Sequence, residues 1–201
     1  MAGEKAEKAT AGRKAEKAEK AEKPEKKEKA AKGANPMREI KIAKVTVNIG
    51  VGSPGERLDN AQKLLQDITG IKPLVTKARV RNPVFKLRKG LPIGVKATLR
   101  KETAKAFLKK AFIAVKNMIN NENFDNRGNF AFGIREYIDF PGVKYNPEIG
   151  MFGFDVCVTL ERPGYRVKKR KIATSSLGKR HWITKDEAVS FVNGAFGVNV
   201  Q

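Results

Sequence analysis

Apolar and polar residues alternate along several segments of this chain, and such alternation is typical of β-strands that bury one face in a core. Val45, Val47 and Ile49 illustrate the pattern, because the polar residues between them fall on the opposite face. The same interpretation extends to four later segments, so that the chain carries five expected strands. The predicted strands are 42–49, 73–80, 92–100, 130–137 and 152–161.

Apolar residues at helical spacing predict three helices among these strands. The first begins at residues 53–56, SPGE, which fit a capping box, and it ends at Gly70. The second covers about 102–120, and the third opens at Thr184, with Glu187 completing another capping box. The residues expected to face inward are Leu58, Ala61, Leu64, Leu65 and Ile68, then Ala104, Leu108, Ala111, Val115 and Met118 flanked by Phe107, Phe112 and Ile119, and finally Ala188, Phe191, Val192 and Ala195.

The order strand, helix, strand, strand, helix, strand, strand, helix predicts an α+β domain with a mainly antiparallel sheet and helices packed on one face. Its first six elements follow the split β-α-β plan, which leaves the other sheet face open. If strands 42–49 and 92–100 share that sheet, their polar residues emerge together as a platform. This platform comprises Lys44, Thr46, Asn48, Lys96, Thr98 and Arg100. Its hydroxyl, amide and cationic groups suit close approach to a sugar-phosphate backbone.

Positive charge is concentrated in the expected domain. The chain has 42 basic and 21 acidic residues, a net charge of +21. Residues 1–34 contain 11 basic and 7 acidic side chains, so the remaining 167 residues carry 31 against 14. Residues 72–101 contain ten Lys or Arg and no Asp or Glu. Such a run repels itself in a free protein, and this indicates RNA or DNA as the partner, although a basic run is also compatible with a solvated face.

Two acid-free basic segments extend from the predicted elements. The loop 79–92 is longer than an ordinary hairpin loop, and we interpret it as a protruding basic finger. The cations of this finger are Arg79, Arg81, Lys86, Arg88 and Lys89. The second segment, 162–182, is a basic arm that we expect to contact RNA. The cations of this arm are Arg162, Arg166, Lys168, Lys169, Arg170, Lys171, Lys179 and Arg180.

The N-terminal segment 1–34 repeats Ala-Glu-Lys with a period of three. This period places no continuous apolar stripe on a helix, and the segment has no aromatic or branched aliphatic residue to bury. We therefore predict a disordered extension at 1–34, followed by a single RNA-binding domain at 35–201. Loose RNA contact and a solubilising role are both compatible with the extension.

Candidate catalytic chemistry is sparse. Cys157 and His181 are the only residues of their types, which excludes an internal disulfide and a structural zinc site built by this chain alone. We expect no metal, no cofactor and no enzymatic activity, because no Gly-rich phosphate loop or paired carboxylates are evident. A turnover abolished by His181→Ala would reopen that possibility. Cys157 is expected to be a buried or half-buried strand residue.

No segment approaches the roughly 18 apolar residues of a membrane span, and the N-terminus lacks the apolar stretch of a signal peptide. We therefore expect a soluble, cytoplasmic protein that does not bind membranes. A DNA-compacting protein or an anionic-membrane binder would share the charge, but it would need neither the finger nor a polar sheet face. Binding to duplex DNA or to vesicles as well as to RNA would identify such a protein.

Residues 127–132, RGNFAF, nearly match the strand that stacks RNA bases in an RNA-recognition motif, but Asn129 breaks the register. Phe130 and Phe132 therefore have two interpretations, base stacking and core packing. Core packing is favoured.

Five motifs in consistent order resemble the universal L-five family of large-subunit ribosomal proteins. They are NIGVG at 48–52, ITGIKP at 68–73, FKLRKGLPIGVKATLR at 85–100, RGNFAFGI at 127–134 and GMFGFDV at 150–156. The resemblance runs from about Asn35 to the C-terminus. The arm sequence RPGYRVKKRK and the closing helix resemble the archaeal and eukaryotic branch. Glutamine is common in the family at the position of Ile71, and the aliphatic side chain cannot make the hydrogen bonds of that amide. Lys72 beside it still matches the family motif.

This resemblance implies a structural component of the large ribosomal subunit that binds 5S rRNA and large-subunit rRNA in the central protuberance. It implies a neighbour of the L-eighteen family and a bridge to a small-subunit head protein of the S-thirteen family. Contacts with 5S rRNA are expected on the platform and at Lys72. The finger, from Arg79 to Lys89, is expected to reach toward P-site tRNA.

Overall fold

The computed structural model describes residues 35–201, and the predicted extension at 1–34 lies outside the described residues. The chain divides into two units, Met1–Glu39 and Ile40–Gln201. The described part of the first unit contains the 3-10 turn η1 (Pro36–Arg38). The Asn35 side chain caps this turn by accepting a hydrogen bond from the Met37 backbone N–H at 3.0 Å.

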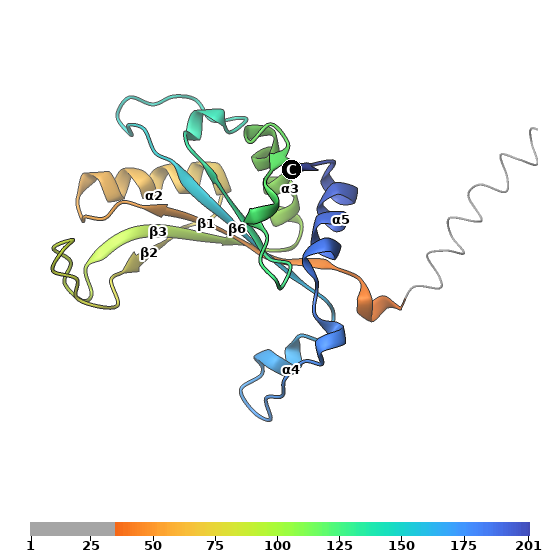
Figure 1. The fold of residues 1–201 in the computed structure, drawn as a ribbon. Helices are drawn as coiled ribbons and strands as arrows, with labels where there is room; N and C mark the ends of the chain where they lie inside the picture. Colours follow the sequence, from red (N-terminus) through yellow and green to blue (C-terminus); the bar gives the residue numbers. More distant parts are fainter. Residues whose placement is uncertain (1–34) are drawn as a thin grey trace, which may run out of the picture. The chain divides into compact units, whose positions relative to one another are not determined.

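Five strands of the second unit form one antiparallel sheet (Figure 1). The strands are β1 (Lys41–Gly50), β2 (Leu74–Lys77), β3 (Pro92–Leu99), β5 (Phe130–Ile134) and β6 (Phe154–Glu161). Their spatial order is β2-β3-β1-β6-β5. As in a split β-α-β unit, β3 lies between β2 and β1. The strand on the other side of β1 is β6 and not β5, the next strand of the sheet along the chain. All five predicted strands are present, most with shorter bounds.

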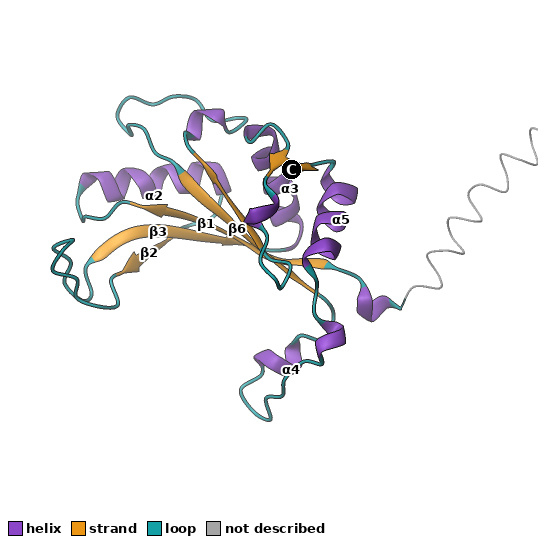
Figure 2. Cartoon of the chain, viewed as in Figure 1, coloured by secondary structure: helices purple, strands orange, loops and turns teal. Residues whose placement is uncertain are grey.

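The three longer helices lie on one face of this sheet, whereas the short α4 (Arg166–Lys169) lies apart from it (Figure 2). Helix α2 (Glu56–Thr69) packs against β3, and α3 (Lys101–Ala114) packs against β1. Helix α5 (Lys185–Phe196) adds Ala188 and Val192 to the same buried cluster. The predicted α+β fold, with a mainly antiparallel sheet and helices on one face, is therefore confirmed.

An aromatic group fills the core between α3, β5 and α5. Phe112 stacks on Phe132 with ring centroids 5.5 Å apart, and it meets Phe196 edge to face at 5.0 Å. Phe130 and Phe132 are buried, so core packing is the correct interpretation of both residues. Their burial leaves no ring face available for an RNA base.

Helices α2 and α5 each differ from the prediction in one detail. Helix α2 begins at Glu56 after Gly55, whose φ of 130° turns the chain, and no side chain caps it. The capping box predicted at 53–56 is therefore wrong. Gly70 ends α2 in the left-handed conformation as predicted, whereas Ala195, expected to face inward on α5, is exposed.

Helix α3 is shorter than the predicted 102–120. It ends at Ala114, because Lys116 and Asn117 adopt positive φ values of 56° and 55° that break the helical path. The next residues form β4 (Met118–Ile119), which pairs in parallel with β7 (Asn199–Val200) near the end of the chain. Met118 is consequently exposed rather than part of the core stripe.

The third helix begins as predicted. The Thr184 hydroxyl accepts a hydrogen bond from the Glu187 backbone N–H at 3.4 Å, and the Glu187 carboxylate accepts one from the Thr184 N–H at 3.1 Å. This reciprocal pair satisfies two backbone donors that the first turn of a helix leaves without partners.

Candidate nucleic-acid interface

The platform residues of β1 and β3 lie side by side in the sheet. The strand register pairs Thr46 with Thr98 and Asn48 with Lys96. Cross-strand partners project to the same face of a sheet, so these four side chains form one continuous polar area. The two remaining members, Lys44 and Arg100, adjoin the pair Val45 and Leu99 at one end of this area.

The platform is held by the core on its other side. Val45, Val47 and Leu99 alternate with platform residues and are at most 1% exposed. Packing of these apolar residues fixes the strand backbones, and through them the spacing of the polar groups. Thr46 and Asn48 are half-buried and Thr98 is exposed, and none of the three side chains bonds to another described residue. Their hydroxyl and amide groups are therefore available to a partner.

Strand β6 extends the platform with two residues that the sequence patterns did not assign to it. The register places Cys157 beside Thr46 and Asp155 beside Asn48. Cys157 is exposed, so the expectation that it is buried or half-buried is wrong. Desolvation of the sulfur and, second, the charge of Asp155 raise the pKa of this thiol above its ordinary value. The alternation of β6 was visible in the sequence, but its place next to β1 was not.

The finger is an ordered turn that carries exposed cations. Asn82 and Leu87 form a pair of backbone hydrogen bonds of 3.0 and 2.9 Å, and the Asn82 side chain accepts a further bond from Val84 N–H at 3.1 Å. The finger extends beyond the ends of β2 and β3 (Figure 1). All five of its predicted cations are exposed, and none pairs with an acidic group of the described residues. These cations are Arg79, Arg81, Lys86, Arg88 and Lys89.

Apolar residues are also exposed on the finger. Val80, Val84 and Phe85 are 75%, 83% and 71% exposed. Exposure of three large apolar side chains on one short loop is typical of a contact surface. Charge alone had identified this loop, and the apolar members were missed because apolar residues in a sequence are first assigned to a core.

The arm leaves the sheet at the end opposite to the finger. Lys41 pairs with Glu161 at the arm end, whereas Gly50 pairs with Gly94 near the finger. The arm contains the helical turn α4 (Arg166–Lys169) and the 3-10 turn η4 (Lys179–His181). Its exposed cations are Arg166, Lys168, Lys169, Arg170, Lys171, Lys179 and Arg180. The platform therefore lies between two cationic extensions.

Arg162 differs from the other arm cations. Its side chain is only 6% exposed, and its guanidinium pairs with Glu187 at 2.9 Å and donates to the Trp182 carbonyl at 3.2 Å. Burial alone would raise the pKa of Glu187, but hydrogen bonds from Thr184 and Arg162 lower it overall. Arg162 therefore links the two ends of the arm to α5, and its charge is already matched inside the protein.

The remaining predicted site residue, Lys72, is exposed in the connection between α2 and β2, and Ile71 beside it is also exposed.

Within residues 35–201, no three His, Cys, Asp or Glu side chains gather as metal ligands do. None of the helices in this part of the chain combines the length and apolar character of a membrane span.

A sheet that helices cover on one face only, with a polar open face and two cationic extensions, has the surface chemistry that suits a polyanionic partner such as RNA. The chain matches the family model "Ribosomal protein L5" over residues 35–88 and the model for the C-terminus of the same ribosomal family over residues 92–191. A large ribosomal subunit protein uL5 from Sulfolobus acidocaldarius is 52% identical, covering 83% of this chain and 93% of the relative. The protein of the same name from Methanococcus aeolicus is 47% identical, with coverages of 83% and 93%.

This chain belongs to the ribosomal protein L5 family. Membership makes it a structural constituent of the large ribosomal subunit and not an enzyme. The relatives cited are archaeal, in agreement with the branch to which the arm sequence points.

Proposed function

We propose that the platform binds 5S rRNA and that the protein helps to form the central protuberance of the large subunit. The observation that carries this proposal is the pairing of Thr46 with Thr98 and of Asn48 with Lys96. These pairs present hydroxyl, amide and ammonium groups in one area, which suits phosphate and ribose 2′-hydroxyl groups. Lys44, Arg100 and Lys72 add positive charge around that area.

The two extensions take different partners in this proposal. The finger reaches P-site tRNA, since its cations are exposed at a distance from the platform and its apolar residues add contact area. The arm binds large-subunit rRNA through its exposed cations. The family resemblance further supports an L-eighteen-type protein as neighbour and an S-thirteen-type protein of the small-subunit head as the partner in an intersubunit bridge.

A binding comparison across a salt series tests the platform. Purified protein is titrated with 5S rRNA and with an unrelated structured RNA of equal length. Selective binding of 5S rRNA at physiological salt supports the proposal, and equal binding of both RNAs contradicts it. With six to ten phosphate contacts, affinity should fall by about 10³ to 10⁵ between 50 and 200 mM salt, and by less if the contacts are to single strands. A flat salt response contradicts an electrostatic mechanism.

A double variant that removes two finger cations tests whether the finger and the platform bind different RNAs. Arg81→Ala with Arg88→Ala should leave 5S rRNA affinity nearly unchanged and should disturb tRNA placement on assembled ribosomes. Both cations lie on the finger and outside the platform, which is the reason for the expected separation. A loss of 5S rRNA binding equal to that of platform variants would contradict this division of roles. Comparable binding of duplex DNA or anionic vesicles would instead support a general polyanion binder.

A further inference from the structure

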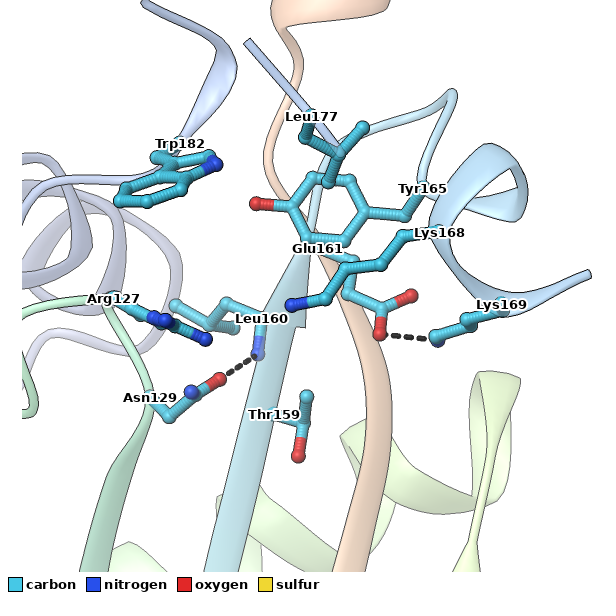
Figure 3. Close-up of a pocket in the computed structure, with 10 residues that line it drawn as sticks. All are labelled: Arg127, Asn129, Thr159, Leu160, Glu161, Tyr165, Lys168, Lys169, Leu177 and Trp182. Atoms are coloured by element: carbon cyan, nitrogen blue, oxygen red, sulfur yellow. Dashed lines mark hydrogen bonds and ion pairs between the residues drawn. The ribbon is translucent and has the colours of Figure 1, made fainter. Parts of the chain in front are cut away.

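The root of the arm contains a cleft that the platform and the finger do not use (Figure 3). Its volume is about 240 Å³. Trp182 lies on one side and Tyr165 on the other, with the Tyr165 hydroxyl toward Trp182, and Lys168 runs beside the Tyr165 ring toward Leu160 (Figure 3). The volume is below the roughly 300–1,000 Å³ of sites for drug-sized ligands, so it fits one small planar group.

The cleft is built from the polar half of the motif at 127–132. The two phenylalanines of that motif are buried in the core, but Arg127 and Asn129 line the cleft. Gly128 between them has a φ of 75°, and a Cβ there would lie 2.6 Å from Ile183 Cγ2. Glycine therefore allows this segment to pack closely beneath Ile183, next to Trp182.

The walls of the cleft are held in place by internal contacts. Arg162 donates to the Trp182 carbonyl at 3.2 Å, and Asn129 Oδ1 accepts a hydrogen bond from Leu160 N–H at 3.3 Å. The second bond orients the Asn129 amide, whose NH₂ group has no partner among the described residues. The cleft thus keeps a fixed hydrogen-bond donor in its wall.

The charge of the cleft favours an anionic ligand. Lys169 pairs with Glu161, the one carboxylate of the lining, as the dashed line in Figure 3 marks. Lys168 forms no ion pair with a described residue. The Arg127 guanidinium lies over the Trp182 ring, 5.3 Å from its centroid. Two cations are therefore left for a ligand beside two aromatic rings.

Aromatic rings next to uncompensated cations are the chemistry of sites that hold single-stranded nucleic acid. We propose that this cleft binds one unpaired nucleotide of ribosomal RNA, with its base against the Tyr165 ring and beside the Arg127–Trp182 pair, and with its phosphate at Lys168 and Arg127. The Asn129 amide donates to an acceptor on the base edge. The inference rests on the proposed RNA-binding function, but it concerns residues outside the platform.

Trp182 is the only tryptophan of the chain, so its fluorescence reports on this cleft alone. Full-length protein is titrated with RNA tetramers of uridine or adenosine and with a tetramer of abasic ribose phosphate, which carries the same charge. Stacking contributes about 1–3 kcal/mol per base, so the abasic tetramer should bind about 5- to 150-fold more weakly. Equal affinities of the abasic and the base-containing tetramers would overturn the inference.

Two variants of the arm provide a matched control. Lys168→Ala and Lys171→Ala each remove one exposed positive charge, but only Lys168 lines the cleft. Lys168→Ala should weaken tetramer binding severalfold more than Lys171→Ala. Tyr165→Leu, which keeps an apolar side chain without the ring, should also weaken binding. Equal effects of the two lysine variants would overturn the inference.

Titration with natural RNAs separates this inference from the proposed function. Either 5S rRNA or a large-subunit rRNA fragment should change Trp182 fluorescence, and the RNA that does so supplies the nucleotide. Tight 5S rRNA binding with no fluorescence change from either RNA overturns the nucleotide site and leaves the platform proposal intact. A fluorescence change without selective 5S rRNA binding supports the nucleotide site and contradicts the platform proposal. A response to a glutamate-rich peptide but to no RNA overturns the inference in favour of a protein partner.

Discussion

The two faces of the sheet are built from the same strands but carry different functions. On β3, Leu99 packs under the helices and is 1% exposed, while its neighbour Thr98 points to the open face. On β1, Val47 and Asn48 divide in the same way. The covered face supplies stability, and the open face carries the polar groups that we propose to bind RNA.

This contrast shows how a protein with little catalytic chemistry builds a binding surface. Because alternate residues of a strand project to opposite faces, the core residues also determine the spacing of the polar groups between them. A one-residue slip in the pairing of β1 and β3 would move the platform residues into the core. The apolar face therefore protects the register on which the platform depends.

The largest expected effect is loss of stability from the covered face. Leu99→Ala should lower the free energy of unfolding by about 2–5 kcal/mol, because it removes buried methyl groups and leaves a cavity. Denaturant unfolding measures this change. At a temperature where the variant is still folded, its 5S rRNA affinity should be close to that of the parent. A stability loss below about 1 kcal/mol would contradict the assignment of Leu99 to the core.

The next effect is loss of RNA affinity from the open face. Asn48→Ala with Thr98→Ala should weaken 5S rRNA binding by about 30-fold, since two hydrogen bonds contribute about 1 kcal/mol each. Each substitution should change the stability by no more than about 0.5 kcal/mol. Filter or gel-shift binding, with unfolding of the same samples, tests both statements. A variant that loses stability but keeps its 5S rRNA affinity would contradict the separate roles of the two faces.

A smaller effect of opposite sign is expected at Asp155. This carboxylate lies beside Asn48 and repels phosphate groups, so Asp155→Asn should tighten 5S rRNA binding by up to about fivefold at low salt. The gain should shrink at high salt. Weaker binding of the variant at every salt concentration would show that the carboxylate contacts the RNA favourably. Unchanged binding at low salt would show that RNA does not cover this part of the face.

The smallest effect of bound RNA is expected on the reactivity of Cys157, whose dependence on pH serves as the baseline. Because its pKa is raised, the thiolate fraction at neutral pH is low, and alkylation by iodoacetamide should accelerate about tenfold per pH unit from pH 7 to beyond the ordinary thiol pKa of about 8.5. At constant pH, bound 5S rRNA should slow alkylation severalfold, since Thr46 lies beside the thiol. Unrelated RNA at the same concentration is the control. An unchanged rate in the 5S rRNA complex would place the RNA elsewhere.

Much of the candidate site was predictable because its signals are local. Alternation identified the platform residues, the absence of acids identified the finger and the arm, and Thr184 with Glu187 identified the start of α5. Arg162 was assigned to the exposed arm because a sequence shows charge but not burial. Its partner Glu187 lies on α5, and only the packing of the arm root against that helix brings the two together.

The periodicity of the strands, the positions of the cationic segments and the family of the chain all follow from the order of its residues. Three other features required the folded chain: β6 lies beside β1, α3 ends early so that β4 pairs with β7, and Tyr165 and Trp182 enclose a cleft with Arg127. The physical reason is the range of the interactions. Periodicity and charge are properties of neighbouring residues, whereas strand order, helix ends and clefts result from pairing and packing between distant parts of the chain.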